Sequence, residues 1–337
     1  MKKYLPLILS LLSAGACDEG VPDEDTDALQ LAVDGGTEGG DGAIWRPKTG
    51  ATWDWQLTTP VDIRANVDIY DVDGFTATAA VIARLHAQGR KVVCYINVGA
   101  WEDWRPDAKD FPPEILGKAW SATKFTDEKW LDIRRIDLLS PILGARFDMA
   151  KSKGCDAIEP DNIDGYDDSG SGEADRTGFE LTAEDQLRFN RYLACEAHQR
   201  GMAIGLKNDT GQAAQLSADF DFVVSEQCFD YNECKKFTPF LRQNKAVLVA
   251  EYREDLGDAA ETKFDGFCKQ AEPLGISAIL KNNALDRWRR GCAHDEPEEA
   301  KPEEAKPAEA KPAEAQPAET KPAEAKPGSA RRRRATP

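Results

Sequence analysis

Eight short apolar runs alternate with helix-like stretches between residues 53 and 281, and this alternation limits the fold more than any other feature. Gly89, Gly154, Gly201 and Gly275 each stand between a helix-like stretch and the next apolar run, where a left-handed cap is expected. The repeated pattern predicts parallel strands joined by crossover helices. The strand-like runs are Trp53–Leu57, Val67–Val72, Lys91–Val98, Asp156–Pro160, Met202–Lys207, Phe222–Glu226, Ala246–Tyr252 and Ile276–Lys281. The helix-like stretches are Thr76–Gln88, Ile136–Lys153, Thr182–Arg200, Gly211–Leu216, Cys234–Gln243 and Ala259–Pro273.

Residues 43–293 have the usual size of a closed (β/α)8 barrel, about 250 residues. We therefore expect an α/β protein with one domain of the TIM-barrel type. Two features depart from the ideal pattern. The first connection, Thr58–Asn66, is too short for a helix, and Trp130–Arg134 is an additional strand-like piece. A Rossmann fold fits less well, because no run is followed by GxGxxG.

Both ends of the chain read as accessory segments. Residues 1–16 carry Lys2 and Lys3, then an apolar run, then small residues, which predicts a signal peptide and export. Cys17 follows directly, so lipid attachment to Cys17 and a membrane anchor are expected; plain secretion is the alternative. Residues 17–42 read as an acidic, disordered spacer and residues 294–337 as a low-complexity tail with Lys-Pro repeats.

The net charge is −17, and residues 43–293 carry −9 of it. An acidic domain argues against nucleic acid as a partner and is compatible with a cationic ligand.

Besides Cys17, the chain has seven cysteines, and an exported protein is expected to pair them. Cys94 lies inside an apolar run, which predicts a buried free thiol. No CxxC spacing supports a metal site. The expected disulfides are Cys228–Cys234, Cys268–Cys292 and Cys155–Cys195.

Polar residues gather at the carboxyl ends of the strand-like runs, where a barrel carries its active site. Carboxylates that converge at one rim repel and desolvate each other, which is unfavourable, so their presence indicates a functional site. Trp55 and Gln56 add an aromatic, hydrogen-bonding floor. The other strand-end residues are Asp71, Asp73, Tyr95, Asn97, Glu159, Asp161, Asn162, Asp164, Tyr166, Lys207, Asn208, Glu226, Glu251 and Tyr252.

Histidine is scarce in the chain, with only His86, His198 and His294. None stands at a strand end, which argues against a Ser-His-Asp triad and a histidine metal site. The available catalytic groups are carboxylates, and two carboxylates are the equipment of glycoside hydrolysis. No cofactor is expected.

The motifs together resemble glycoside hydrolase family 114, the endo-α-1,4-polygalactosaminidases. The resemblance covers Trp53–Arg253 and extends more weakly to about Cys292. It is carried by Trp53-x-Trp55-Gln56-Leu57, Val92-Val93-Cys94-Tyr95-Ile96, Trp130-Leu131-Asp132-Ile133-Arg134, Glu159-Pro160-Asp161-Asn162-x-Asp164-Gly165-Tyr166, Leu206-Lys207-Asn208, Glu226-Gln227-Cys228-x5-Cys234 and Glu251-Tyr252.

This resemblance implies an endo-acting hydrolase of α-1,4-linked, partly deacetylated galactosamine polymers. It places the nucleophile or stabilising carboxylate at Asp161 and the acid/base at Glu226, with retention as the expected route. Alternatives are another α-glycosidase specificity on the same barrel, or a tethered glycan-binding protein without activity. We expect a monomer. The segment Asp167–Arg176 is longer than the usual turn of the family and adjoins the expected site.

The remaining strand-end residues are expected to bind substrate. Asp71, Asp73, Glu159, Asp164 and Glu251 would receive the ammonium groups of galactosamine. Tyr95, Asn162, Tyr166, Lys207 and Asn208 would fix hydroxyl groups, with Asn97 and Tyr252 beside them.

Overall fold

The structure is a computed structural model that describes residue 17 and residues 44–120, 127–168 and 176–292. The expected signal peptide, spacer and tail lie outside these residues, apart from Cys17, and so does most of the insertion after Asp167. Within the described ranges, no helix has the length and apolar character needed to cross a membrane.

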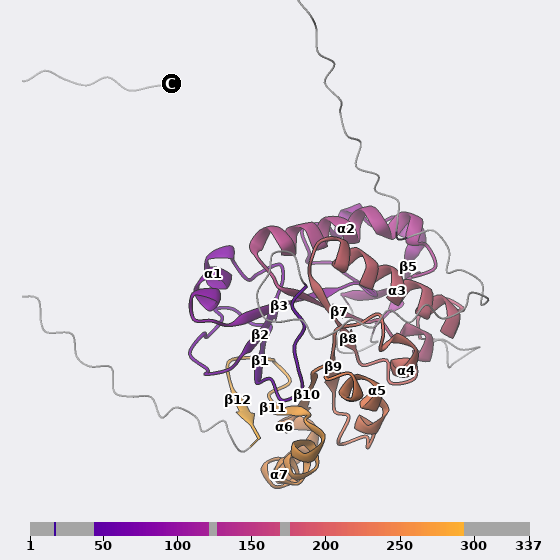
Figure 1. The fold of residues 1–337 in the computed structure, drawn as a ribbon. Helices are drawn as coiled ribbons and strands as arrows, with labels where there is room; N and C mark the ends of the chain where they lie inside the picture. The colour runs from indigo at the N-terminus through magenta and orange to yellow at the C-terminus, as the bar shows by residue number, and fades with distance from the viewer. Residues whose placement is uncertain (1–16, 18–43, 121–126, 169–175, 293–337) are drawn as a thin grey trace, which may run out of the picture. The chain divides into compact units, whose positions relative to one another are not determined.

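Eight parallel strands form the main sheet in chain order, as the apolar runs predicted. Each strand begins and ends within two residues of its predicted run (Figure 1). The strands are β1 (Trp53–Gln56), β2 (Ile69–Asp73), β3 (Lys91–Asn97), β7 (Ala157–Asp161), β8 (Ala203–Lys207), β9 (Phe222–Glu226), β10 (Val247–Tyr252) and β11 (Ser277–Lys281).

The sheet curls until its two ends meet, which makes a nearly closed barrel. The Trp53 indole on β1 donates to the carbonyl of Ser277 on β11 at 3.0 Å. Close by, Lys281 Nζ lies 2.9 Å from Asp54 Oδ1. A short strand, β12 (Arg289–Gly291), pairs antiparallel with β11. The predicted TIM-type barrel is therefore confirmed, with side-chain contacts and β12 at the seam.

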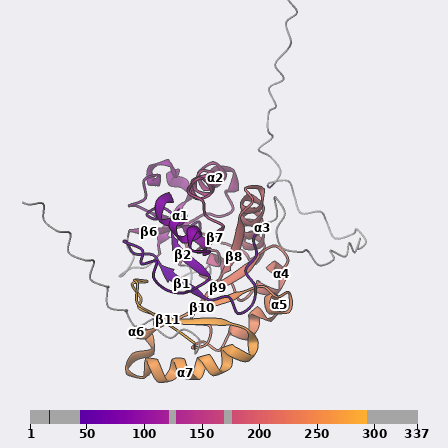
Figure 2. The same cartoon turned by 60° about the vertical axis from the view of Figure 1, so that its left-hand side comes forward.

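Helices cover the outside of the barrel (Figures 1 and 2). As predicted, the β1–β2 connection has no helix. The α-helices are α1 (Ala79–Ala87), α2 (Ile136–Lys153), α3 (Ala183–Gln199), α4 (Ala213–Leu216), α5 (Thr238–Arg242), α6 (Arg253–Leu256) and α7 (Ala260–Ala271). Short 3-10 turns are η1 (Ala108–Asp110), η2 (Pro113–Ile115), η3 (Gly165–Asp168), η5 (Cys234–Phe237), η6 (Gly257–Ala259) and η7 (Glu272–Leu274).

Local signals explain where the helices stop and start. Gly89, Gly154, Gly201 and Gly275 have φ values of 78°, 99°, 67° and 71°, so the predicted left-handed caps are confirmed. At the start of α3, the Thr182 side chain accepts from the amide of N3 and the N3 carboxyl accepts in return. Such a capping box stabilises a helix by about 1 kcal/mol.

A second, antiparallel sheet lies between β3 and α2 in the chain. It consists of β4 (Ala100–Glu102), β5 (Leu116–Ala119) and β6 (Glu128–Leu131), in the order β4–β6–β5. The additional strand-like piece is therefore real, although it begins at Glu128 rather than Trp130. Gly99, which directly precedes β4, passes close to the backbone that follows β7. A Cβ at this position would lie 1.6 Å from the Asn162 carbonyl oxygen, so only glycine fits.

The apolar core has two layers. One lies between the strands and the surrounding helices. The other fills the barrel interior and includes Trp53, Ile69, Val93, Phe222 and Leu248. This interior layer fills the barrel below the carboxyl ends of the strands, so the polar side chains at those ends lie above packed apolar residues.

Four disulfides join all eight cysteines. Cys228–Cys234 and Cys268–Cys292 are confirmed. The expected Cys155–Cys195 pair and the free thiol at Cys94 are wrong, because Cys94 pairs with Cys155 and Cys195 pairs with Cys17. Cys94 faces the helix layer from β3, next to the start of β7, which brings it within a Cα–Cα distance of 6.0 Å of Cys155.

The Cys17–Cys195 bond also contradicts lipid attachment at Cys17, since a sulfur in a disulfide cannot carry a thioether. Disulfides persist in oxidising compartments, and this agrees with the export expected from residues 1–16.

Candidate active site

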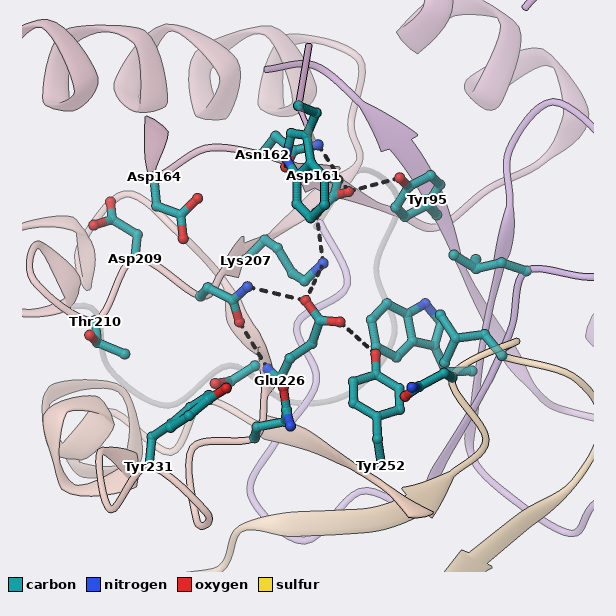
Figure 3. A pocket seen from close by; sticks show the side chains of 18 of the residues that line it. Tyr95, Asp161, Asn162, Asp164, Lys207, Asp209, Thr210, Glu226, Tyr231 and Tyr252 are labelled. Carbon is teal, nitrogen blue, oxygen red and sulfur yellow. Dashed lines mark hydrogen bonds and ion pairs between the residues drawn. The ribbon is translucent and has the colours of Figure 1, made fainter. Parts of the chain in front are cut away.

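Three side chains from consecutive strand ends meet at the carboxyl end of the barrel: Asp161 on β7, Lys207 on β8 and Glu226 on β9. Figure 3 shows the lysine between the two carboxyl groups. Its Nζ lies 2.7 Å from Asp161 Oδ1 and 3.2 Å from Glu226 Oε2. Both oxygens contact one nitrogen, so they lie within about 6 Å of each other, close to the separation of a retaining pair.

Asp161 is held as an anion. Tyr95 Oη donates to its Oδ2 at 2.8 Å, and Asn162 Nδ2 donates to the same oxygen at 3.2 Å. Burial alone would raise the pKa of Asp161, but the charge of Lys207 and the hydrogen bonds from Lys207 and Tyr95 lower it below its ordinary value. The carboxylate is therefore ionised at neutral pH.

Glu226 is oriented by neutral donors. Tyr252 Oη donates to its Oε1 at 2.5 Å, and Asn208 Nδ2 donates to its Oε2 at 3.2 Å. In return, the Glu226 amide donates to Asn208 Oδ1 at 2.9 Å. The Glu226 side chain is 30% exposed, whereas that of Asp161 is 19% exposed, so Glu226 is the more accessible of the two.

Backbone strain is concentrated directly after these strands. Asn162, Asn208, Asp209 and Gln227 have φ values of 61°, 51°, 37° and 58°. Left-handed conformations of residues other than glycine are uncommon and cluster at functional sites. Here they turn the Asn162 and Asn208 amides back onto the two carboxyl groups.

A cavity of about 680 Å³ opens above these side chains. Its volume lies in the usual range for a ligand site. Nine of the expected site residues line it: Trp55, Tyr95, Asp161, Asn162, Asp164, Lys207, Asn208, Glu226 and Tyr252. The Trp55 ring also lies against Lys207, with Nζ 5.1 Å from the ring centroid.

Four of the expected ammonium-binding carboxylates are buried in the protein and do not line the cavity. Asp73 accepts from the Phe75 and Thr76 amides and pairs with Arg105, and Glu251 accepts from the Phe229 amide. Glu159 lies two residues before the end of β7 and is fully buried. Asp71 is fully buried as well, so the structure does not place these four groups at the cavity, and their contact with a sugar stays a prediction.

Three further candidates have structural contacts instead. Gln56 donates to Asp54 and exchanges hydrogen bonds with the Asp62 backbone. Asn97 accepts from the Ala100 amide and from Asn162 Nδ2. Tyr166 lies outside the cavity lining, with its hydroxyl bonded to Asp209.

Part of the cavity wall consists of residues that were not predicted to bind substrate: Trp120, Glu128, Trp130, Asp167, Asp209, Tyr231, Glu233 and Asp255. Asp209 could have been found, since it follows Asn208 at the end of a strand-like run. Glu128 could not, because β6 belongs to the second sheet and no strand-end rule applies to it.

The two histidines in the described ranges do not line this cavity. His86 pairs with Asp156 and His198 with Asp221, while His294 lies outside the described residues. In the described ranges, no group of three or more His, Cys, Asp or Glu side chains could hold a metal ion.

Comparison with known proteins agrees with this geometry. The chain matches the model of the glycoside-hydrolase family GH114 over residues 36–296. Among solved structures, it is similar to Aspergillus fumigatus Ega3 in complex with galactosamine, with 36% identity and a TM-score of 0.67, covering 74% of this chain and 98% of that chain. The fold is also similar to the glycoside hydrolase domain of PelA from Pseudomonas aeruginosa, with 14% identity and a TM-score of 0.54, covering 72% and 98%. A comparison with curated proteins gave no match.

Proposed function

Because the chain belongs to glycoside hydrolase family GH114, we propose that it cleaves internal α-1,4 linkages of galactosamine-containing polysaccharides. The observation that carries this proposal is the pair of carboxyl groups, Asp161 and Glu226, bridged by Lys207 at the floor of an acidic cavity. The similarity to Ega3, whose structure contains galactosamine, supports the choice of sugar.

In the proposed mechanism, Asp161 attacks the anomeric carbon or stabilises the oxocarbenium-like transition state. Glu226 donates a proton to the leaving oxygen and then removes one from the attacking water. Lys207 and Tyr95 keep Asp161 ionised, and Tyr252 and Asn208 fix the direction of the Glu226 carboxyl. The short separation of the two carboxyls favours retention of the anomeric configuration.

Carboxyl groups on the cavity wall fit a cationic polymer. Burial, together with Glu102 and Asp161, raises the pKa of Glu128 to about 8. Burial and the neighbouring Asp164 likewise raise the pKa of Asp209 to about 8. An ammonium group in the cavity would offset this repulsion, since an opposite charge nearby favours the ionised carboxylate. The other acidic residues in the lining are Asp167, Glu233 and Asp255.

The direct test is incubation of the purified protein with α-1,4-linked galactosaminogalactan, followed by measurement of reducing ends and product length. We expect short oligosaccharides early in the reaction. Monosaccharide release from chain ends would instead indicate an exo-acting α-glycosidase, and binding without cleavage would indicate a glycan-binding protein. Either result would overturn the proposal.

Glu128→Gln should lower kcat/KM for fully deacetylated polymer by about tenfold, because it removes one half-buried charge that would face the substrate ammonium. The loss should shrink at high salt and on N-acetylated polymer, which has no ammonium group. Asp258→Asn removes the same charge from η6, outside this cavity, and is the matched control. Equal losses on both polymers would contradict charge recognition by Glu128.

A further inference from the structure

Two carboxyl groups lie beneath the catalytic side chains and have no part in the mechanism above. Asp71 is on β2 and Glu159 is on β7, and both are fully buried. They do not line the cavity. Such groups are costly to bury as anions, and their presence in the barrel interior needs a physical reason.

This buried carboxyl pair lacks the donors that normally accompany buried carboxylates. In the described part of the chain, none of the four carboxyl oxygens accepts a hydrogen bond of good geometry from a group outside the pair. The Val72 amide lies near enough to Asp71 to lower its pKa, but burial outweighs this effect. The nearest cation is Lys207, whose Nζ lies 3.4 Å from Glu159 Oε1. Asp71 and Glu159 are close enough for Glu159 to raise the pKa of Asp71. Two carboxyl groups can hydrogen bond to each other only when at least one carries a proton.

The surroundings also favour a proton on the pair. Facing it are Tyr95 on β3, Asp161 on β7, Lys207 on β8, Glu226 on β9 and Tyr252 on β10, with the neutral Trp55 ring on β1. Lys207 is the one cation in this set, opposite four carboxyl groups. Burial and the neighbouring Glu159 raise the pKa of Asp71 well above its ordinary value, and burial raises the pKa of Glu159 to about 7.

We infer that Asp71 is protonated and donates to Glu159, and that this pair positions Lys207 on the two catalytic carboxyl groups. The distances from Lys207 Nζ support the inference: 2.7 Å to Asp161, 3.2 Å to Glu226 and 3.4 Å to Glu159. Of the three carboxyl groups, Glu159 is furthest from Lys207, as expected if Glu159 is only partly ionised. When Glu159 becomes fully ionised, it competes with Asp161 for Lys207, and activity falls.

Titration of the pair should add a decline in activity on the alkaline side of the pH profile to that caused by loss of the proton from the general acid Glu226. This prediction rests on the proposed function for its activity readout. Between pH 6 and pH 8 the wild-type kcat should fall by about tenfold, because the protonated fraction of a single group with pKa near 7 falls by that order. Folding of every variant is checked by thermal unfolding.

Three variants separate positioning by a proton from a merely structural role. Asp71→Asn keeps a neutral donor to Glu159, so the alkaline decline should stay where it is, with kcat within about threefold of wild type. Asp71→Leu has no donor, so the pKa of Glu159 rises and the decline should move to higher pH. Glu159→Gln removes the group that titrates in the pair, so the part of the decline that the pair causes should disappear and only the part due to Glu226 should remain. An unchanged decline in all three variants, or an equal shift in Asp71→Asn and Asp71→Leu, overturns the inference.

A spectroscopic measurement tests whether Asp71 carries a proton, and it does not depend on an activity assay. The infrared difference spectrum of wild type minus Asp71→Asn should contain the C=O stretching band of a neutral carboxylic acid, persisting above pH 8. Absence of this band overturns the inference even if the enzyme cleaves galactosamine polymers. Its presence supports the protonated pair even if the substrate proves to be different, so the two proposals fail separately.

Discussion

Asp161→Asn is expected to reduce kcat for polysaccharide cleavage by roughly 10⁴-fold or more, a loss typical of removing a catalytic nucleophile. The amide is nearly the same size as the carboxylate but is neither a useful nucleophile nor a negative charge for the oxocarbenium-like state. The measurement is the initial rate of reducing-end formation on galactosamine polymer, with thermal unfolding to show that the variant folds.

The matched control is Asp54→Asn. Asp54 is another buried aspartate paired with a lysine of the barrel, Lys281, at 2.9 Å, and it contacts neither catalytic carboxyl. This variant should lose stability while its folded fraction keeps most of its kcat. If Asp161→Asn retains activity within tenfold of wild type, Asp161 is not the catalytic carboxylate.

Glu226→Gln should behave differently from Asp161→Asn. Loss of a general acid/base lowers the rate by about 10²–10⁴-fold. The defect should be smaller for substrates with a good leaving group, which need little protonation. An equal defect for good and poor leaving groups would argue against Glu226 as the acid.

Lys207→Met is expected to lower the free energy of unfolding by about 3–5 kcal/mol at neutral pH, because it leaves buried carboxylates without their cation. Lys207 is 3% exposed and contacts Asp161, Glu159 and Glu226. Activity should be lost as well, since the charge of Lys207 is the leading influence that lowers the pKa of Asp161 against burial.

The pH dependence of this variant has a definite sign. Without Lys207, the folded-state pKa values of Asp161 and Glu159 rise above those of the unfolded chain, about 4. The folded state then binds more protons, so the variant is least impaired near pH 4 and loses stability as the pH rises. Chemical denaturation at pH 4.5 and pH 8 measures the difference.

Lys281→Met is the control for removal of a buried barrel lysine. It leaves mainly Asp54 unpaired, so its stability should depend less on pH. An unfolding free energy of Lys207→Met within about 1 kcal/mol of wild type at pH 8 would show that the carboxyl cluster does not need this cation.

The sequence predicted the fold well because its signals are local. Four glycines, each after a helix and before an apolar run, mark where helices end and strands begin, and the alternation of helices and apolar runs predicts parallel strands in chain order. The disulfides were harder to predict. Cys94 looks buried in sequence, but only the adjacency of β3 and β7 shows that it faces Cys155.

The position of a residue along its strand explains why some predicted site residues do not reach the cavity. Glu159 and Asp161 share one face of β7, but they differ by two residues, or about 6–7 Å along the strand. That distance separates a buried group from a catalytic one. Glu251 fails for another reason, because it alternates with Tyr252 and points away from the cavity, toward the Phe229 amide. A strand-end rule cannot distinguish these positions unless the end of each strand is known to one residue.

Residues from two separate sheets line the cavity. Asp161, Lys207 and Glu226 stand on β7, β8 and β9, whereas Glu128 and Trp130 reach the cavity from β6, outside the barrel. Sequence change in β6 can therefore alter the cavity wall while the spacing of Asp161, Lys207 and Glu226 stays fixed. For protein engineering, Glu128 and Trp130 are therefore positions at which the cavity wall can be varied while Asp161, Lys207 and Glu226 are left unchanged.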